Sequence, residues 1–328
     1  MSTSLTADLR PELALLTTGW QLPAERLPAV EALLRAHQEN GATASDLPAG
    51  TPSDPSAWGG AARPFDDQQT PTPLVLSPAG QATCLQAWRF FHAERTIARE
   101  LLSRARRPGP PLRRPAAGLI GDLPPGSLNP RQQEAVQVAL EKPLALITGG
   151  PGTGKTHALA RLLALLLLDQ PGNPPTVLLA APTGKAALRM RDAVRSAVEN
   201  LGERFQAARA DLNRIAAGAS TLHQLLGFNP GTGRCRFGPD QRLRADVVII
   251  DECSMVDTLL WQALLAALPD SARLILLGDP HQLESVAAGD VLGSLVFLGE
   301  DGSASPLAPV WVELVDSHRF RKRPGIGR

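Results

Sequence analysis

The pattern of apolar positions divides the chain at about residue 128. Before this point it predicts two helices, a short amphipathic one over residues 23–37 and a longer one over residues 82–107. Two stretches rich in proline and glycine, residues 41–63 and 108–126, have the composition of linkers or irregular loops. The pattern therefore predicts a small, mainly helical N-terminal domain over residues 1–126.

After residue 128, short apolar runs alternate with longer segments whose apolar positions have helical spacing. The predicted strands cover residues 144–148, 176–181, 247–250 and 274–277, and the predicted helices cover residues 156–168, 185–199 and 256–268. Because strands that alternate with helices are joined by right-handed crossovers, they form a parallel sheet with helices on both faces. The expected fold class is α/β, with a small insertion between residues 200 and 246.

Composition limits the possible functions without selecting one. The 328 residues are enough for two or three domains, and a net charge of +1 leaves any DNA contact to local basic patches. The longest apolar stretch, residues 158–168, contains Arg161 and is too short to span a bilayer, and no signal peptide is visible. Three widely spaced cysteines, Cys84, Cys235 and Cys253, argue against a zinc site or a disulfide framework. We expect a cytoplasmic protein without a membrane partner.

A run of basic residues lies near the end of the predicted N-terminal domain. Its members are Arg95, Arg99, Arg104, Arg106, Arg107, Arg113 and Arg114. Such a run can contact phosphate groups, but arginines at these spacings are more often the solvated face of a helix. We favour the solvated face as the interpretation.

One segment has the pattern G-x-x-x-x-G-K-[ST] of a phosphate-binding loop. It reads Gly149-Gly150-Pro151-Gly152-Thr153-Gly154-Lys155-Thr156, with a predicted strand before it and a predicted helix after it. Glycines let consecutive backbone N–H groups point inward around phosphate oxygens, and the helix N-terminus adds favourable partial charge. Lys155 would reach the β- and γ-phosphates of ATP, and the Thr156 hydroxyl would ligate Mg²⁺. The segment predicts an ATP site with Mg²⁺ as cofactor.

Polar residues follow two later strands. Asp251 and Glu252 come directly after the apolar run 247–250. Many strands end in acids, but beside a phosphate loop the pair has a specific chemistry: Asp251 would hold Mg²⁺, and Glu252 would orient and deprotonate the attacking water. After the run 274–277, Gln282 is our candidate for a side chain that senses the γ-phosphate.

Companion motifs resemble those of superfamily 1 helicases. Residues 128–135 resemble the Q motif, with Gln132 at the position of the glutamine that recognises adenine. Residues 181–187 and 220–223 resemble motifs Ia and Ib, which contact single-stranded DNA in that family. The resemblance implies that the DNA-binding residues are Thr183, Lys185, Thr221 and His223.

The remaining motifs indicate the RecD branch of this superfamily. Residues 251–255 look like motif II, and residues 278–283, followed by Ser285, Val286 and Gly289, resemble motif III of the RecD type. Residues 317–320 look like motif IV, in which Arg319 would approach the γ-phosphate. The resemblance implies a lobe with the RecA-like fold over residues 127–316 and the start of a second RecA-like lobe over residues 317–328.

The resemblance also implies an activity and partners. Members of this branch act as ATP-dependent 5′→3′ DNA helicases, and RecD itself is the alpha subunit of exodeoxyribonuclease V, the RecBCD heterotrimer of double-strand break repair. The expected partners are therefore single-stranded DNA and the RecB and RecC subunits. Residues 73–101, an extended segment and then a helix, are similar to the RecD region that docks on RecC. Motifs V and VI do not follow Arg319, so we expect this chain to bind ATP without acting as a motor alone.

Two other functions are compatible with the sequence. The first is a RecD-like helicase that works outside a three-subunit complex. The second is a nucleotide-responsive docking subunit without motor activity, because a single lobe can bind ATP without turning it over.

Overall fold

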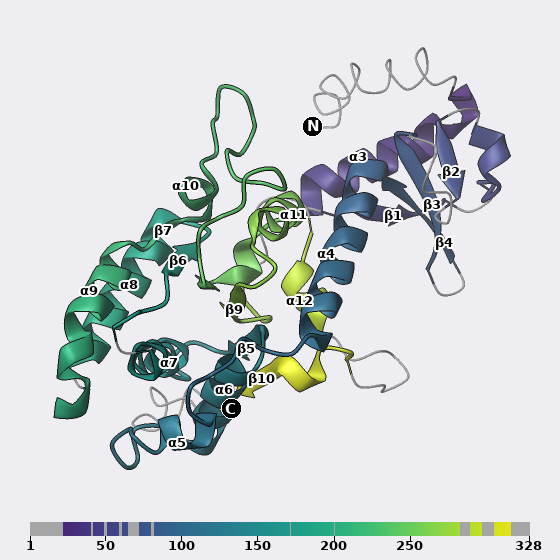
Figure 1. Ribbon diagram of the computed structural model, residues 1–328. Helices are drawn as coiled ribbons and strands as arrows, with labels where there is room; N and C mark the ends of the chain where they lie inside the picture. The colour runs from purple at the N-terminus through teal and green to yellow at the C-terminus, as the bar shows by residue number, and fades with distance from the viewer. Residues whose placement is uncertain are drawn as a thin grey trace. The chain divides into compact units, whose positions relative to one another are not determined.

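The computed structural model describes residues 22–40, 42–48, 51–58, 61–64, 72–79, 82–170, 172–199, 201–282, 289–296 and 305–315. The chain forms two compact units (Figure 1). An N-terminal unit contains the residues up to Ile97, together with residues 257–259 and 285–289. A large unit contains the rest of the chain from Ala98.

A six-stranded parallel sheet forms the centre of the large unit, in the order β10-β5-β9-β8-β6-β7. The strands are β5 (Leu144–Gly149), β6 (Val177–Ala181), β7 (Ser220–Thr221), β8 (Val247–Ile250), β9 (Arg273–Gly278) and β10 (Trp311–Leu314). Every residue of β5, β8 and β9 is buried, as expected for parallel strands that are covered on both faces. The predicted α/β class with a parallel sheet is confirmed.

Helices cover the sheet of the large unit. They are α5 (Ala116–Ile120), α6 (Pro130–Glu141), α7 (Lys155–Asp169), α8 (Gly184–Glu199), α9 (Arg209–Ala217), α10 (Leu222–Leu226), α11 (Thr258–Ala267) and α12 (Val291–Val296), with short 3-10 turns η3 (Glu203–Ala208), η4 (Cys253–Met255) and η5 (Ala308–Val310). Alternate strand residues such as Ala145 and Ile147 share one core with α5 to α9. The residues between them, such as Leu144 and Leu146, therefore face the other side of the sheet, where Figure 1 shows α11 and α12.

The segment predicted as an insertion is partly built into the sheet. Its first half forms η3 and α9, which pack with α7 and α8, and then β7, which pairs with β6 as the edge strand. Only the stretch after Leu226 leaves the sheet. It is an irregular loop with one isolated bridge, between Asn229 and Arg234, before the chain returns as β8.

The N-terminal unit contains a sheet as well as helices. Its four strands have the order β1-β4-β3-β2. Its elements are η1 (Ala24–Arg26), α3 (Leu27–Asn40), β1 (Ala44–Asp46), η2 (Pro55–Trp58), β2 (Ala62–Pro64), β3 (Leu74–Ala79), β4 (Ala82–Ala87) and the first half of α4 (Trp88–Arg106). Fully buried Trp58 and Leu85 lie in its core, against Val30 and Leu33 of α3. The sheet was not predicted.

The helix predicted over residues 82–107 starts too early. Residues 82–87 are the strand β4, which pairs antiparallel with β3 along its whole length, and α4 begins only at Trp88. The two strands adjoin in the chain, so a hairpin satisfies their backbone groups and places Leu85 opposite Leu76 in the core. This local pairing outweighs the helical spacing of the apolar residues.

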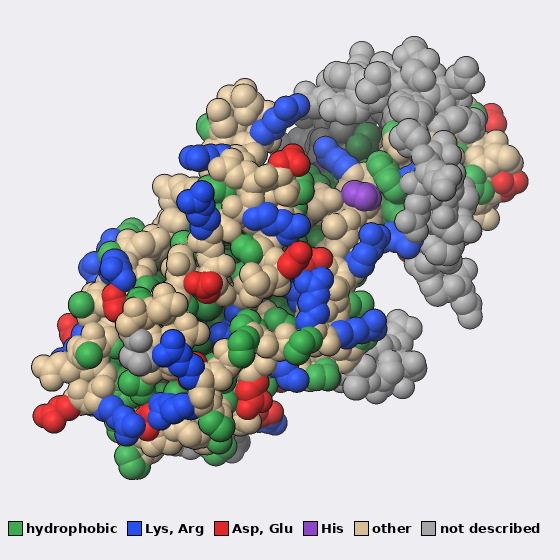
Figure 2. All heavy atoms as spheres, in the orientation of Figure 1, with side chains coloured by type: hydrophobic (Ala, Val, Ile, Leu, Met, Phe, Trp, Pro, Cys, Tyr) green, Lys and Arg blue, Asp and Glu red, His purple; other side chains and the backbone are tan. Residues whose placement is uncertain are grey.

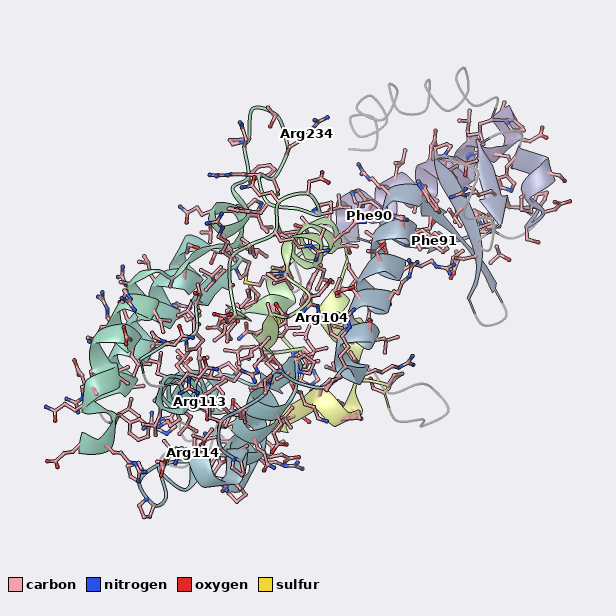
Figure 3. The ribbon with its side chains drawn as sticks, viewed as in Figure 1. Phe90, Phe91, Arg104, Arg113, Arg114 and Arg234 are labelled. Carbon is pink, nitrogen blue, oxygen red and sulfur yellow. The ribbon has the colours of Figure 1, made fainter. Side chains whose placement is uncertain are left out.

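Arg104 overturns the favoured interpretation of the basic run for one of its members. Its side chain is fully buried and donates hydrogen bonds to the carbonyl oxygens of Pro269 and Ala272, both at 3.0 Å (Figure 3). It also donates to the Glu100 carboxylate at 3.0 Å. Arg104 therefore fixes the last turns of α4 to the loop that precedes β9.

Among the described helices, none is long and apolar enough to cross a membrane.

Candidate nucleotide-binding site

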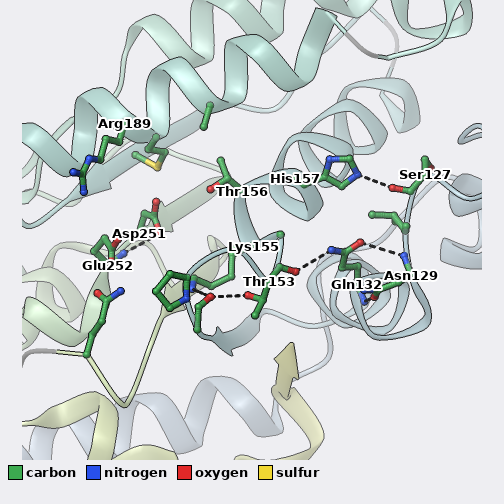
Figure 4. A pocket seen from close by; sticks show the side chains of 18 of the residues that line it. Ser127, Asn129, Gln132, Thr153, Lys155, Thr156, His157, Arg189, Asp251 and Glu252 are labelled. Atoms are coloured by element: carbon green, nitrogen blue, oxygen red, sulfur yellow. Dashed lines mark hydrogen bonds between the residues drawn. The ribbon is translucent and has the colours of Figure 1, made fainter. Parts of the chain in front are cut away.

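A cavity of about 1170 Å³ opens at the carboxyl ends of β5 and β8 (Figure 4). It is large enough for a ligand of nucleotide size, since small-molecule sites typically have volumes of about 300–1,000 Å³. Its walls are Gly126, Ser127, Leu128, Asn129, Gln132, Gly150, Pro151, Gly152, Thr153, Gly154, Lys155, Thr156, His157, Arg189, Met190, Ala193, Asp251, Glu252 and Gln282. The structure thus brings together the phosphate loop, the two acids, Gln132 and Gln282, as the sequence predicts.

The phosphate loop has the geometry that its glycines allow. Gly154 has a φ of 88° and stands at the N-cap of α7, with no side chain capping the first N–H groups of the helix. These N–H groups and the positive end of the helix dipole are therefore available to an anion in the cavity. Lys155 donates hydrogen bonds from Nζ to the carbonyl oxygens of Gly149 and Gly150, so its ammonium group lies inside the loop.

Gln132 is buried and fixes the phosphate loop. It is the third residue of α6 and forms a capping box with Asn129: its Oε1 accepts from the Asn129 N–H, and its own N–H donates to the Asn129 side chain. Its Nε2 donates to the carbonyl oxygen of Thr153 at 3.0 Å. A Cβ on Gly154 would lie only 2.3 Å from Nε2, so a glycine is required there by contact as well as by φ.

The two acids lie where β8 ends. The carboxylate of Asp251 accepts from the Glu252 N–H at 2.9 Å, and the Asp251 N–H donates to the carbonyl oxygen of Ala180. Burial of the Asp251 carboxyl, and then repulsion from Glu252, raise the pKa of Asp251 to about 6. Glu252 has a φ of 53°, and its Oε2 is buried without a hydrogen-bond partner among the described residues.

The donor set fits Mg²⁺ together with a nucleotide. Thr156 supplies a hydroxyl and Asp251 a carboxylate on one wall of the cavity, and hard oxygen donors of this kind suit Mg²⁺. A cation there would also relieve the repulsion that raises the pKa of Asp251. Within the described residues, no group of three or more His, Cys, Asp and Glu side chains forms a metal site by itself.

The sequence did not single out one wall of the cavity. Arg189, Met190 and Ala193 of α8 line it, although the sequence connected the start of this helix only with DNA. Arg189 follows Lys185 by four residues, so the two share a helix face, and this spacing was the available signal.

Comparison with known proteins gives the family. A family model described as an AAA domain matches residues 132–288. The chain is 39% identical over 282 residues to "RecBCD enzyme subunit RecD" of Mycolicibacterium smegmatis, which covers 83% of this chain and 46% of that protein. It is 38% identical over 149 residues to the "ATP-dependent RecD2 DNA helicase" of Deinococcus radiodurans, which covers 44% of this chain and 17% of that protein. The chain is a RecD-like superfamily 1 helicase sequence.

The similarity is partial in two respects. The RecD-like chain spans less than half the length of the curated RecD relatives that it matches. Among solved structures, the Pif1 helicase from Candida albicans aligns with 22% identity and a TM-score of 0.37, over 60% of this chain and 42% of that one.

The four residues predicted to bind DNA lie outside the nucleotide cavity. Thr183 and Lys185 are exposed at the start of α8, and Thr221 and His223 lie where β7 passes into α10. Ala181 of β6 is paired with Thr221 of β7, so both pairs of residues belong to the same end of the sheet. Their hydroxyls also have local roles, because Thr183 accepts from the Ala186 N–H and Thr221 from the Gln224 N–H.

A basic loop next to this edge was missed by the sequence reasoning. His223 contacts Phe228 edge to face, with ring centroids 5.2 Å apart, and the irregular loop of the RecD-like chain starts there. Arg234, Arg236 and Arg244 of this loop are exposed. Figure 3 shows Arg234 near the tip, and Figure 2 shows the basic side chains in blue over this part of the surface. Arginines beside an exposed aromatic ring are typical of single-strand contacts, and their clustering in residues 234–244 was the available signal.

Three predicted features lie outside the described residues. They are Arg319 with the rest of the motif at 317–320, the second lobe predicted to start at residue 317, and the motif III positions 283–288. Gly289 is described and has a φ of 99°.

Proposed function

We propose that this chain carries the ATP-binding lobe of an ATP-dependent DNA helicase that works as the RecD-like subunit of a RecBCD complex. The observation that carries the proposal is the cavity in which the phosphate loop meets the adjacent acids Asp251 and Glu252. The relatives named RecD and RecD2 support helicase activity, because the second is named as a DNA helicase and the first as a subunit of the RecBCD enzyme.

Each wall of the cavity has a task in phosphoryl transfer. The N–H groups of the loop and the Lys155 ammonium group would bind the β- and γ-phosphates, and Thr156 and Asp251 would hold Mg²⁺. When bound, Mg²⁺ neutralises charge that develops on the phosphates. Glu252 would take the proton of the attacking water, Gln282 would sense the γ-phosphate, and Gln132 would hold the loop in place while its remaining N–H contacts adenine.

DNA contact is proposed for the first turn of α8 and for the neighbouring residues where β7 passes into α10. Thr183, Lys185, Thr221 and His223 would contact a single strand at the β6–β7 end of the sheet, and Arg234 of the basic loop would neutralise phosphate. Binding should weaken with salt, with a slope of about −0.7 per phosphate contact on a log–log plot. We propose that the N-terminal region, including residues 73–101, docks on RecC, and that Arg319 completes the site in the full-length protein.

A RecD-like helicase outside the complex is the second candidate. The match to the RecD2 helicase favours it, but that match extends over 149 residues, against 282 for the RecD of Mycolicibacterium smegmatis. The longer alignment covers more of this chain, so the complex subunit is the better supported function.

The test uses the full-length protein assembled with its RecB and RecC homologues. We expect strand separation and ATP hydrolysis by this subunit to require the phosphate loop. The Lys155→Ala complex should therefore show lower rates of both activities than the wild-type complex. The matched control is Lys142→Ala, which changes a lysine at the end of α6 outside the cavity. A Lys155→Ala complex that hydrolyses ATP and separates strands as fast as the wild-type complex would contradict the proposal. If the chain copurifies with neither homologue but unwinds DNA alone, the second candidate is correct.

A further inference from the structure

Arg189 is a charged group in the nucleotide cavity for which neither the sequence motifs nor the relatives give a role. It lies on α8, and its neighbours Met190 and Ala193 line the same wall. In Figure 4 its guanidinium group lies at the end of the cavity that contains Asp251 and Glu252, away from Gln132 and Asn129. The side chain therefore extends to the catalytic end of the site.

The side chain of Arg189 does not stabilise the fold through polar contacts with the described residues. It is exposed, and within the described part of the chain no hydrogen bond or ion pair involves its side chain. By contrast, Arg191 on the same helix bonds to the Asp192 carboxylate at 3.0 Å. A guanidinium group that lines a cavity without an internal partner has all five of its N–H donors available to a ligand.

The charges of the cavity favour an anionic partner for Arg189. Its lining contains two carboxylates, Asp251 and Glu252, and two permanent cations, Lys155 and Arg189. Lys155 lies inside the phosphate loop, where the β- and γ-phosphates are expected, and the acids lie where the water attacks. A second cation on the side of the acids is therefore placed to reach the outermost phosphate. Arginine binds phosphate oxygens in a two-pronged geometry that lysine does not provide.

We propose that Arg189 contacts the terminal phosphate of bound ATP from α8, as a catalytic residue in addition to those predicted from the sequence. The inference rests on the proposed function, because it requires the cavity to bind ATP. It also gives α8 two tasks, since Lys185 at its first turn is a candidate for DNA contact and Arg189 one turn later reaches the nucleotide. Movement of this helix on DNA would then change the distance between Arg189 and the phosphate.

The test compares ATP with ADP, because only ATP has the terminal phosphate. Binding of fluorescent methylanthraniloyl ATP and ADP, each with Mg²⁺, is measured for the 328-residue chain and its variants. Arg189→Ala should weaken ATP binding by about tenfold to a hundredfold, the range expected for loss of a charged hydrogen bond, and ADP binding by less than about threefold. Arg189→Lys should recover part of the loss, because it restores the charge without the two-pronged contact.

Two controls make the result decisive. Arg195→Ala removes another exposed arginine of α8 that does not line the cavity, and it should leave both affinities unchanged. Lys155→Ala should weaken both nucleotides, and if it leaves ATP binding intact, the proposed function fails rather than this inference alone. Suppose that Lys155→Ala weakens the binding of both nucleotides. The contact with the terminal phosphate is then refuted if Arg189→Ala weakens ATP binding and ADP binding equally, or if it weakens the binding of neither nucleotide.

Discussion

Glu252, the proposed catalytic base, has an unfavourable local structure. It is the only residue other than glycine with a positive φ in the described part of the chain. The left-handed conformation costs an L-residue about 1–2 kcal/mol, and a buried oxygen without a hydrogen bond costs about 1–3 kcal/mol. The adjacent Asp251 adds repulsion, which is, after burial, the second cause that raises the pKa of the Asp251 carboxyl. We therefore expect Glu252→Gly to make the protein more stable.

The size of this gain follows from opposing contributions. Glycine removes the backbone strain and the buried oxygen of Glu252, but it costs about 0.5–1 kcal/mol in conformational entropy of the unfolded chain. The free energy of unfolding should therefore rise by about 1–4 kcal/mol, and each kcal/mol should raise Tm by about 2 °C in a chain of this length. Glu252→Ala isolates the backbone contribution. It also removes the oxygen but keeps a Cβ at φ 53°, so it should be about 1 kcal/mol less stable than Glu252→Gly.

The same substitutions should remove catalysis. Without a carboxylate to take the proton of the attacking water, ATP turnover by the full-length protein should fall by about 10²–10⁴-fold. Glu252→Gln keeps the size of the side chain and the φ of 53°, so it should lose turnover while retaining ATP binding and most of the strain. Stability is measured by urea and thermal unfolding of the 328-residue chain, and turnover by phosphate release. A Glu252→Gly protein that is less stable than both wild type and Glu252→Ala would refute the reasoning.

Three other predictions test the surroundings of the site. Burial and then repulsion from Glu252 raise the pKa of Asp251 to about 6, so the contribution of its protonated form to the free energy of unfolding is complete below about pH 4 and is lost as the pH rises through about 6. Asp251→Asn should therefore be more stable than wild type above pH 6 and equal to it near pH 4 in urea unfolding. Gln132→Ala should weaken the binding of tripolyphosphate about tenfold, as well as that of ATP, in a competition assay, because the substitution removes the hydrogen bond that holds the phosphate loop. If only ATP binding is weakened, Gln132 contacts the base without holding the loop. Arg104→Met should lower the free energy of unfolding by about 2–4 kcal/mol, because it removes two hydrogen bonds from a charged donor and leaves the Ala272 carbonyl without that donor, while the Pro269 carbonyl keeps the Ala272 N–H. Arg106→Ala, at an exposed position of the same helix, should change it by less than about 0.5 kcal/mol.

The large sheet was predictable because burial on both faces leaves a continuous apolar run. The predicted strands 144–148, 247–250 and 274–277 agree with β5, β8 and β9 to within one residue at every boundary. β10 was missed because its four residues include exposed Glu313, which interrupts the run. The N-terminal sheet was missed for a related reason. β1 and β2 have three residues each, and strands this short have no period that the sequence can reveal.

The candidate site was predictable where its parts are local in the chain. The phosphate loop needs only a strand, a turn of fixed length and a helix, and all three adjoin in sequence. Arg189 was not predictable as a part of the cavity, because its place there depends on how α8 packs beside α7. The left-handed conformation of Glu252 was also invisible, since the same pair of acids occurs at the end of many strands in ordinary conformations.

Gln132 shows what a motif leaves out even when its residue lies in the predicted cavity. Resemblance to the Q motif assigns it to adenine, yet its Oε1 and one N–H of Nε2 bond to Asn129 and to Thr153, 21 residues away. The same Nε2 occupies the space that a Cβ on Gly154 would need. The conformation of the phosphate loop, and with it the proposed recognition of the base, would therefore depend on one amide group. A residue type in a pattern cannot reveal this dependence, because it arises from the contact between two segments that the sequence presents as separate motifs.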